Sequence, residues 1–429
     1  MEEIRLISIE KKEGTIRYNW SCSERLKKYF SGNNFLIEYP ESIENVPDGV
    51  LAIPFVASVL PISWLADCEL CITELDSDFY NSISKIKNGF INMYPEATFA
   101  GSLKVDSVID CTPDKSGGTA SFFSGGLDAT TTLLRHINEK PALLTLWGAD
   151  VAFDNYDGWS VVEHGITEIA QKYGLEHITI HTKFRNFEDS GELYADFGSV
   201  LHTTWWYGIK HGIGIISHAA PYAWLHGINT VYIASSDCEE DGPQQCASYP
   251  TIDNNVSYCN CSTVHDGFEL NRQDKVRFIV EYKKQNPEDH IFIRACWKAE
   301  DGGNCCKCEK CYRTMAGFWI EGEDPKNYGF YYSQDVFKRM YQLIALHAND
   351  LPSRSWTYMK RRLNDNWDSI KKKKYSRKIR WIRDFDFLHL DDNRCRIKYL
   401  KTWRVKSRLV KLFPKIYNMY IKFRGYKFE

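Results

Sequence analysis

The chain has 429 residues, and its 43% hydrophobic and 14% aromatic content is enough to fill the cores of two or three domains and excludes a disordered protein. The formal net charge of -2 hides an asymmetry, because residues 351–429 hold 24 Lys and Arg against 7 Asp and Glu, while the rest of the chain holds 30 against 49. The first residues, MEEIRLISIEKKEG, lack the apolar core of a signal peptide, so we expect a cytoplasmic protein whose cysteines are thiols or metal ligands.

Residues 1–115 are expected to form a small α+β domain. The strand-like pieces EIRLISIE, GTIRYNW and NFLIEY precede DFYNSISKIKNGFINMY, whose apolar residues recur at helical spacing. The uncharged run at residues 50–66 is too short, and too broken by Pro54 and Pro61, for a transmembrane segment, and we predict a buried strand and turn there. The loop TPDKSGGTA at residues 112–120 supplies a domain boundary.

In residues 116–329 the sequence pattern differs from that of the first domain. Short apolar runs alternate with segments whose apolar residues recur at helical spacing. The apolar runs TASFF, ALLTLW, EHITIHT and NTVYIA predict strands, and the intervening segments predict helices. This alternation indicates an α/β fold, a doubly wound parallel sheet with helices on both faces. Three of the expected strands run into SGGLD, WGAD and ASSD, so small and acidic residues collect where such sheets bind ligands.

Residues 330–429 are basic and aromatic, which predicts helices with basic outer faces rather than a disordered tail. The four lysines at 371–374, with Trp381, Trp403, Tyr417 and Tyr420 nearby, suit single-stranded nucleic acid. The same composition suits anionic lipid or docking against the acidic body. Because the two charges nearly cancel, docking against the body is favoured slightly.

The stretch FFSGGLDATTTLL places two glycines between an expected strand and an expected helix. Gly125 and Gly126 let backbone N–H groups turn inward, and the N-terminus of the helix adds positive potential, so the loop predicts an anion cradle that suits phosphate. The alternative is a glycine turn required by geometry alone. The loop lacks the Gly-Lys-Ser/Thr ending of a Walker A motif.

This motif resembles the S-G-G-x-D-S/T signature of the PP-loop ATP pyrophosphatases, which belong to the adenine nucleotide alpha hydrolase-like fold. Ala129 departs from the signature, since the family usually has serine there. The resemblance implies cleavage of ATP between its α and β phosphates, with Asp128 helping to position Mg²⁺ and pyrophosphate. It also implies an ATP-binding set formed by Ser124, Gly125, Gly126, Leu127, Asp128 and Thr130.

Five cysteines lie in the stretch CWKAEDGGNCCKCEKC, and four of them have the spacing C-x8-C-x2-C-x2-C. A C-x2-C pair presents two thiolates to one ion, and tetrahedral zinc takes four ligands, so Cys296, Cys305, Cys308 and Cys311 predict a zinc knuckle. Cys306 breaks this pattern and is the expected bystander. An iron–sulfur cluster, scattered thiols and a redox pair are the alternatives.

The cysteine spacing, on one chain with S-G-G-x-D, resembles the 7-cyano-7-deazaguanine synthases of queuosine biosynthesis. The resemblance covers about residues 120–318 and leaves out the first domain and the basic region. It implies adenylation of a deazaguanine-like carboxylate, followed by attack of ammonia or another amine to give a nitrile or an amide. ATP, Mg²⁺ and Zn²⁺ are the cofactors that it implies.

Charged residues near the expected strand ends are further candidates. Asp237 follows an expected strand and could meet ATP, Mg²⁺ or substrate. Arg272 and Lys275 could neutralise developing pyrophosphate, and a lysine at a similar position in the synthases places Lys275 above Arg272. His265 and Asp266 lie in the same stretch, and surface or core roles are the alternative for each residue.

Three functions are therefore open on the sequence. The first is an ATP pyrophosphatase and carbon–nitrogen ligase that acts on a small carboxylate, with Asp128, Lys275 and Asp237 as catalytic residues. The second transfers the activated group to a macromolecular acceptor, either RNA or protein. The third is a binding module in which the nucleotide loop and the zinc knuckle serve recognition only.

Overall fold

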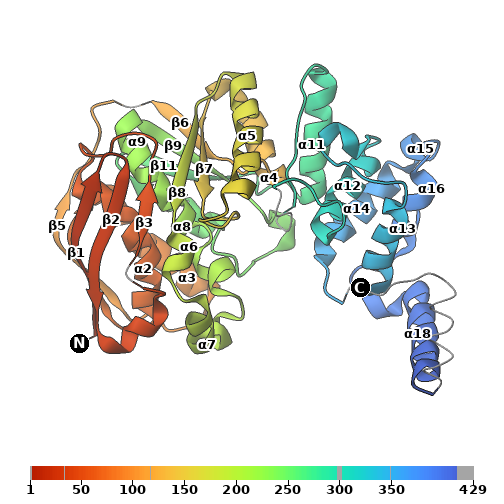
Figure 1. Ribbon diagram of the computed structural model, residues 1–429, viewed down its shortest axis with the longest axis horizontal. Coiled ribbons are helices and arrows are strands. Elements are labelled where there is room, and N and C mark those ends of the chain that lie inside the picture. The colour runs from red at the N-terminus through yellow and green to blue at the C-terminus, as the bar shows by residue number, and fades with distance from the viewer. Residues whose placement is uncertain (1, 33, 116, 297–301, 348, 413–429) are drawn as a thin grey trace. The chain divides into compact units, whose positions relative to one another are not determined.

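The computed structural model describes residues 2–32, 34–115, 117–296, 302–347 and 349–412 (Figure 1). The chain divides into two compact units. The first, which we call the sheet unit, comprises Met1–Asn304 and Asn327–Gly329, and the second, the helical unit, comprises Cys305–Lys326 and Phe330–Glu429. The boundary expected near residue 115 falls between two strands of one sheet, inside the sheet unit.

The sheet unit is an α/β structure built on one large, mostly parallel sheet. Its strands are β1 (Glu3–Lys12), β2 (Thr15–Cys22), β3 (Leu36–Glu38), β4 (Glu69–Asp76), β5 (Ser102–Ile109), β6 (Gly118–Phe122), β7 (Ala142–Trp147), β8 (His177–Thr182), β9 (Ile228–Ala234), β10 (Ser257–Tyr258) and β11 (Cys261–Asp266). Its α-helices are α1 (Asp48–Leu51), α2 (Ile53–Leu65), α3 (Ser77–Met93), α4 (Leu127–Arg135), α5 (Tyr156–Tyr173), α6 (Phe184–Phe187), α7 (Ser190–Leu201), α8 (Ile213–Ile216), α9 (Ala220–His226), α10 (Pro250–Asp253) and α11 (Arg272–Gln285). Short 3₁₀ turns lie at Glu24–Tyr29, Ile137–Glu139, Ser217–Ala219 and Glu239–Asp241, and a π-helical turn at Trp206–Lys210.

The strand order is β10-β11-β9-β6-β7-β8-β3-β2-β1-β4-β5. The strands β11, β9, β6, β7 and β8 are mutually parallel, and taken in chain order they give the doubly wound order 3-2-1-4-5. Chain order reverses between β6 and β9, so these neighbouring strands form the switch point where ligands bind in such sheets. The prediction of a largely parallel α/β sheet is confirmed.

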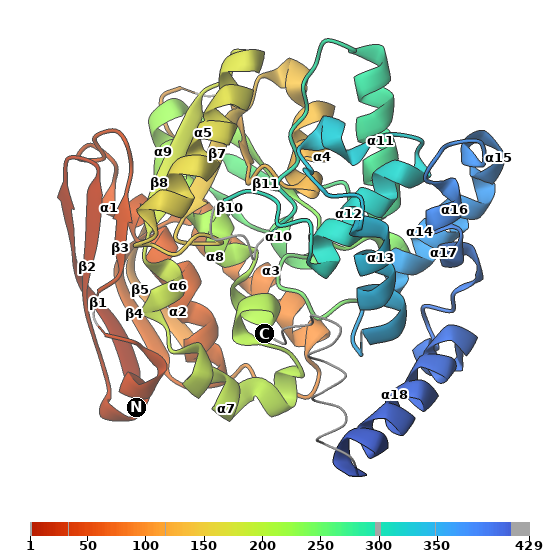
Figure 2. The same ribbon diagram turned by 45° about the vertical axis from the view of Figure 1, so that its right-hand side comes forward.

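Helices cover both faces of this parallel region, as its buried strands require. On one face, α4 and α5 pack Leu133, Trp159 and Ile166 against Phe123 and Trp147. Figures 1 and 2 show α5 running alongside β7 and β8. The other face belongs to a larger core with α2, α8 and α9.

The N-terminal strands extend the same sheet rather than forming one of their own. β3 pairs with β8 in antiparallel register, with Ile37 opposite Thr182 and Glu38 opposite His181. The expected strands of this region are β1, β2 and β3, and the expected amphipathic helix is α3. Local patterning located these elements correctly, but it carried no information about the long-range β3–β8 pairing.

The strand and turn predicted at residues 50–66 are wrong, because the segment is helical. Helices α1 and α2 occupy it, with Pro54 in the first turn of α2 and Pro61 inside that helix. Proline is tolerated in a first turn because the N–H groups there have no helical partner. Nearly every side chain of α2 is buried, and a helix that is apolar all round shows no periodicity.

The helical unit contains the expected helices of the basic region. Its elements are α12 (Glu309–Ile320), α13 (Val336–Tyr341), a π-helical turn (Gln342–His347), α14 (Ser353–Asp365), α15 (Trp367–Ile370), α16 (Ser376–Ile379), α17 (Trp381–Asp384), a 3₁₀ turn (Leu390–Asp392) and α18 (Arg394–Leu412). A further 3₁₀ turn (Pro325–Tyr328) includes residues of both units. Trp356, Leu363 and Ile379 are buried, whereas the lysines at 371–374 are exposed. The side chain of Trp403 and the residues Tyr417 and Tyr420 lie outside the described part of the chain.

Among the described residues, no helix is both long enough and apolar enough to cross a membrane. This agrees with the expectation that the apolar run at residues 50–66 does not span one.

Candidate functional site

The glycine loop connects β6 to α4 at the switch point of the sheet. Gly125 has a φ of +73°, a left-handed conformation that favours glycine. Gly126 is the N-cap of α4, and a Cβ built there would lie 3.3 Å from Ser124 Oγ. A glycine N-cap has no side chain that could accept the N–H groups of the first turn, so the cap itself does not compete with an anion for these donors. The loop therefore has the geometry of an anion cradle.

Asp128, in the first turn of α4, meets two cations from α11. Arg272 Nη1 lies 3.3 Å from Asp128 Oδ2, and Lys275 Nζ lies 3.3 Å from Asp128 Oδ1. The Lys275 side chain is only 2% exposed, and its Nζ also donates to the carbonyl of Ser235 at 2.5 Å. Because Ser235 directly follows β9, Lys275 joins the ends of the two strands that define the switch point.

The structure thus brings Asp128 next to two residues that lie more than a hundred positions later in the sequence. Asp128, Arg272 and Lys275 form one charged cluster beside the glycine loop. Sequence reasoning ranked Lys275 above Arg272, whereas both contact Asp128 at equal distance. Two positive charges next to an anion cradle favour a ligand that carries several negative charges.

Asp237 lies just beyond Ser235 at the end of β9 and is half-buried. Burial raises the pKa of its carboxyl above the usual range, and a hydrogen bond from Tyr207 Oη at 3.2 Å and the charge of Lys275 partly offset this effect. A carboxyl with a raised pKa at a strand end has the electrostatic character of a group that exchanges protons.

Two members of the expected ATP-binding set have buried side chains. Leu127 is buried at 1% exposure, and Thr130 is buried at 3% within α4. Ala129 belongs to the apolar cluster that α4 and α5 form with β6 and β7. This burial gives a structural reason for alanine there, since a serine hydroxyl would enter an apolar environment.

The other candidates from this stretch have structural partners. Asp266 accepts a hydrogen bond from Thr132 at 2.8 Å and lies 3.2 Å from His136 Nε2. His265 Nδ1 pairs with the buried Asp253 at 2.8 Å. These contacts tie β11 to α4 and to α10, so they support the sheet around the site.

Arg294 was not a sequence candidate, yet it contacts the glycine loop directly. Its backbone N–H donates to Gly125 O at 2.7 Å, and its Nε–H donates to Ser124 O at 3.1 Å. The residue comes from the segment that precedes the first cysteine of the cluster. Its position two residues before Cys296 was the sole sequence signal available, and no motif marks it.

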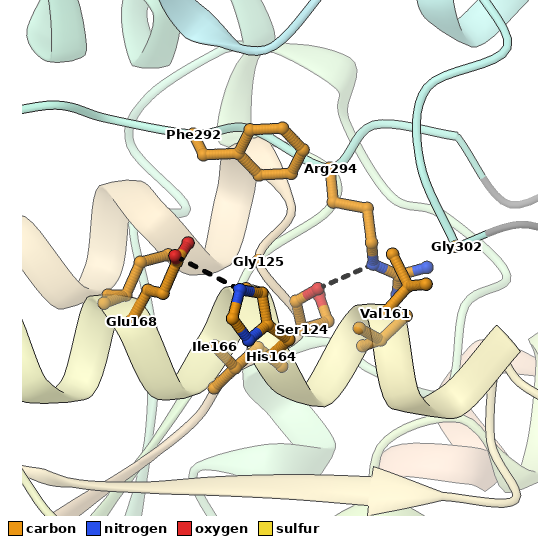
Figure 3. Close-up of a pocket in the computed structure, with 12 residues that line it drawn as sticks. Ser124, Gly125, Val161, His164, Ile166, Glu168, Phe292, Arg294 and Gly302 are labelled. Atoms are coloured by element: carbon orange, nitrogen blue, oxygen red, sulfur yellow. Dashed lines mark hydrogen bonds and ion pairs between the residues drawn. The ribbon is translucent and has the colours of Figure 1, made fainter. Parts of the chain in front are cut away.

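A cavity of about 190 Å³ opens beside the loop, between α5 and the segment that carries Arg294. Figure 3 shows the Arg294 side chain reaching from this segment to Ser124, with Val161 on the facing helix and Phe292 above. Most of the lining is apolar. An apolar cavity with a few convergent polar groups is typical of small-molecule sites.

The four predicted metal ligands come together. The Sγ atoms of Cys296, Cys305, Cys308 and Cys311 all lie within 4.8 Å of one another. The Cys305–Cys311 separation is 3.9 Å, close to the ~3.8 Å between thiolates that share one tetrahedral zinc ion. A multi-iron cluster would hold its thiolates further apart, because several metal ions lie between them. The set therefore suits a single ion such as zinc.

The surroundings of the cluster follow from the local sequence. Cys308 is the N-cap of α12, and its Sγ accepts from the Cys311 N–H at 3.5 Å, as in a metal knuckle. Cys306 has a φ of +52°, and it is not one of the four clustered sulfurs. Its exclusion from the ligand set matches the sequence prediction.

Comparison of this chain with protein-family models, with curated proteins and with solved structures found no significant match.

Proposed function

We propose that the sheet unit binds ATP with Mg²⁺ at the glycine loop, cleaves it between the α and β phosphates, and adenylates a carboxylate. The observation that carries this proposal is the meeting of Arg272 and Lys275 at Asp128, beside a helix N-terminus that is capped by glycine at the switch point. The PP-loop resemblance of Ser124, Gly125, Gly126 and Asp128 supplies the reaction class.

The chain offers suitable groups for the charges that this reaction develops. The N–H groups of the first turn of α4 face the phosphates, and Arg272 and Lys275 offset the charge of the leaving pyrophosphate. Asp128 supplies the carboxylate oxygens that Mg²⁺ prefers, so the residues fit that ion. Bound Mg²⁺ would neutralise phosphate oxygens.

A nitrogen nucleophile then replaces AMP on the activated carboxylate. Ammonia or another amine must lose a proton as the new carbon–nitrogen bond forms. We assign Asp237 to accept this proton, because its carboxyl lies at the end of β9 near the charge of Lys275 and has a raised pKa. By resemblance the carboxylate is deazaguanine-like. Replacement of AMP by ammonia gives the amide, and a nitrile requires a second ATP, which adenylates the amide oxygen so that this oxygen leaves with AMP.

The cysteine cluster fits a structural zinc site. Four cysteine ligands leave no open coordination position for a substrate, which is typical of structural zinc. Zn²⁺ would fix the turn that follows Arg294 and the start of α12.

A macromolecular acceptor is the second candidate, and the exposed surface of the helical unit favours it. Residues 371–380 expose seven cations, at 371–374, 377, 378 and 380, while Ile370, Ile379 and Ile382 in and beside this segment are buried. The exposed cations suit a nucleic-acid backbone, and because these three isoleucines are buried, they offer no apolar face for insertion into lipid.

Product analysis tests the adenylation directly. The protein is incubated with ATP, Mg²⁺ and 7-carboxy-7-deazaguanine, with and without ammonium, and the nucleotides are separated. We expect AMP and pyrophosphate with an acyl-adenylate, and nitrile or amide when ammonium is added. Release of ADP and phosphate, or no ATP consumption with this and other small acids, would refute the proposal.

The macromolecular acceptor is tested by RNA binding at several salt concentrations. Changing the four lysines at 371–374 to serine should lower the slope of log K against log salt by about 3. A control variant that changes the exposed Lys12, Lys85 and Lys104 should leave the slope unchanged. Equal slopes in both variants would remove the support for an RNA acceptor.

A further inference from the structure

Arg294 is a largely buried cation with an incomplete set of partners among the described residues. Its side chain is 11% exposed, and the nearest acidic atom of the described residues, Asp150 Oδ2, lies 3.7 Å from Nη2. That distance exceeds a hydrogen bond, and the Asp150 side chain is 52% exposed. Of the five guanidinium N–H donors, the one on Nε is used by Ser124 O. A buried charge is costly unless an opposite charge and hydrogen bonds compensate it.

The remaining donors of Arg294 lie at the cavity beside the glycine loop. Arg294, Ser124 and Gly125 line this cavity together, and Figure 3 shows the guanidinium between Ser124 and Val161. The planar fork of a guanidinium matches two oxygens of one phosphate group. The loop offers backbone N–H groups to the same anion from α4.

We propose that Arg294 binds the phosphate tail of the nucleotide and that the metal cluster holds it in position for this role. The inference rests on the proposed ATP site and assigns to that site a ligand that the S-G-G-x-D motif does not contain. The ligand class is a polyphosphate, either as part of ATP or as pyrophosphate.

The backbone around Arg294 connects it to the cysteine cluster. The N–H groups of Ala295 and Cys296 donate to Asn304 Oδ1 at 2.9 and 3.2 Å, and Asn304 Nδ2 donates to Ile293 O at 2.7 Å. Asn304 lies between the metal ligands Cys296 and Cys305, directly before Cys305. Its side chain therefore holds the backbone on both sides of Arg294. A bound metal that fixes Cys296 and Cys305 therefore fixes the backbone that carries the guanidinium.

A second anchor lies upstream of Arg294. Asp289 accepts hydrogen bonds from Tyr173 Oη at 2.8 Å and Tyr282 Oη at 3.0 Å, and Lys172 Nζ lies 3.3 Å from it. These contacts tie the segment to the ends of α5 and α11. Arg294 is thus held between a fixed acidic anchor and the metal cluster, a preorganised arrangement that lowers the entropic cost of binding an anion.

Calorimetric titration with pyrophosphate, ATP and adenosine, each with Mg²⁺, tests the assignment. Arg294→Met should weaken pyrophosphate and ATP binding about ten- to a hundredfold, because hydrogen bonds to a charged group are lost. Adenosine affinity should not change, which a merely structural role for Arg294 would not predict. Arg294→Lys, which keeps the charge and loses the fork, should lie between Arg294→Met and the wild type.

Arg25→Met is the matched control, because Arg25 also donates to a backbone carbonyl, that of Ala66, away from the glycine loop. It should bind all three ligands as the wild type does. Removing the metal from the wild type with a chelator should weaken pyrophosphate binding, and zinc should restore it. If Arg294→Met loses its zinc or the circular dichroism spectrum of the folded protein, the pyrophosphate affinity of Arg294→Lys tests the inference instead.

The outcomes separate this inference from the proposed function. If the wild type converts ATP to AMP but Arg294→Met and Arg294→Lys bind pyrophosphate as tightly as it does, the inference is wrong and the proposed function stands. If the wild type binds neither ATP nor pyrophosphate, both are wrong. Weakening of pyrophosphate and ATP with unchanged adenosine binding supports the inference.

Discussion

The two halves of the sheet each place an aspartate where a strand passes into a helix, and the two residues have different partners. Asp76, at the end of β4, is 1% exposed and accepts the N–H groups of Phe79 at 3.0 Å and Cys259 at 3.1 Å. Asp128, after β6, is 21% exposed in its side chain and meets two cations instead. Asp76 therefore caps a helix and holds the turn between β10 and β11, whereas Asp128 pairs with two cations beside the glycine loop.

This difference shows that position in the fold alone does not distinguish a carboxylate that could bind a ligand from one that caps a helix. Each residue follows the carboxyl end of a strand that has parallel neighbours, the kind of position where α/β sheets bind ligands, although β4 and β6 run in opposite directions. Asp76 accepts both backbone N–H groups on Oδ2, and at 1% exposure the carboxylate is hardly accessible to a ligand. Asp128 instead contacts two cationic side chains. A phosphate could take over these cations, and a metal ion could take over the carboxylate. The partners of a carboxylate therefore carry the functional information.

The most direct test of this difference between Asp76 and Asp128 is to remove the charge of each aspartate in turn. Asp128→Asn should lower AMP formation about 10²- to 10³-fold, the range for losing one preorganised electrostatic group, while zinc content and thermal midpoint stay close to those of the wild type. Asp76→Ala should leave turnover per folded molecule unchanged. It should cost about 2–4 kcal/mol of unfolding free energy, since a cap is lost and the buried Cys259 N–H loses its acceptor.

Turnover assays and denaturant unfolding of both variants measure these effects. The comparison fails if Asp128→Asn mainly destabilises the fold, or if Asp76→Ala abolishes AMP formation in protein that is still folded.

The cysteines allow the same contrast between a ligand and its neighbour. Cys308→Ser should lose the bound metal and several degrees of thermal stability, because metal binding contributes folding free energy. Cys306→Ser should keep full zinc content, since its sulfur lies outside the clustered set. Metal analysis by mass spectrometry and thermal unfolding give the result. Equal metal loss in the two variants would contradict the assignment of ligands.

Sequence patterns predicted those parts of the structure that depend on interactions between neighbouring residues. The strand-to-helix alternation gave the parallel sheet, and the cysteine spacing gave all four members of the cluster, because both are encoded by neighbouring residues. The helix α2 was missed since an apolar segment without periodicity does not distinguish a buried helix from a buried strand. Arg294 and the convergence of Arg272 with Lys275 were not predictable in detail, because they depend on how distant segments pack.

The two cations at Asp128 should differ in their contribution to turnover. Lys275→Met should lower AMP formation about tenfold to a hundredfold, and Arg272→Met should have a smaller effect. The reason is that Lys275 is almost fully buried and fixed by the Ser235 carbonyl, so it is preorganised for the developing charge. Steady-state kinetics compare the two variants. A larger loss of AMP formation in Arg272→Met than in Lys275→Met would contradict this prediction and show that burial of the cation does not decide its contribution to turnover.

The smallest expected effect concerns the pH dependence of stability at Asp237. Burial raises the pKa of this carboxyl in the folded protein, so the folded state holds the proton more strongly than the unfolded state does. Its contribution is therefore fully favourable below the pKa of an unfolded aspartate. It is lost as the pH rises through the raised folded value, because ionising a half-buried carboxyl is unfavourable. Asp237→Asn should remove this trend.

The difference in unfolding free energy between wild type and Asp237→Asn, measured by urea denaturation from about pH 4 to pH 7, should change in favour of the variant as pH rises. Tyr207→Phe is the matched control, because Tyr207 donates the hydrogen bond that offsets part of the shift. Losing that donor should raise the pKa of Asp237 further and steepen the trend. A difference that is flat with pH would mean that Asp237 is solvated well enough to ionise normally, and its pKa would then no longer support its assignment as the group that takes a proton from an attacking amine.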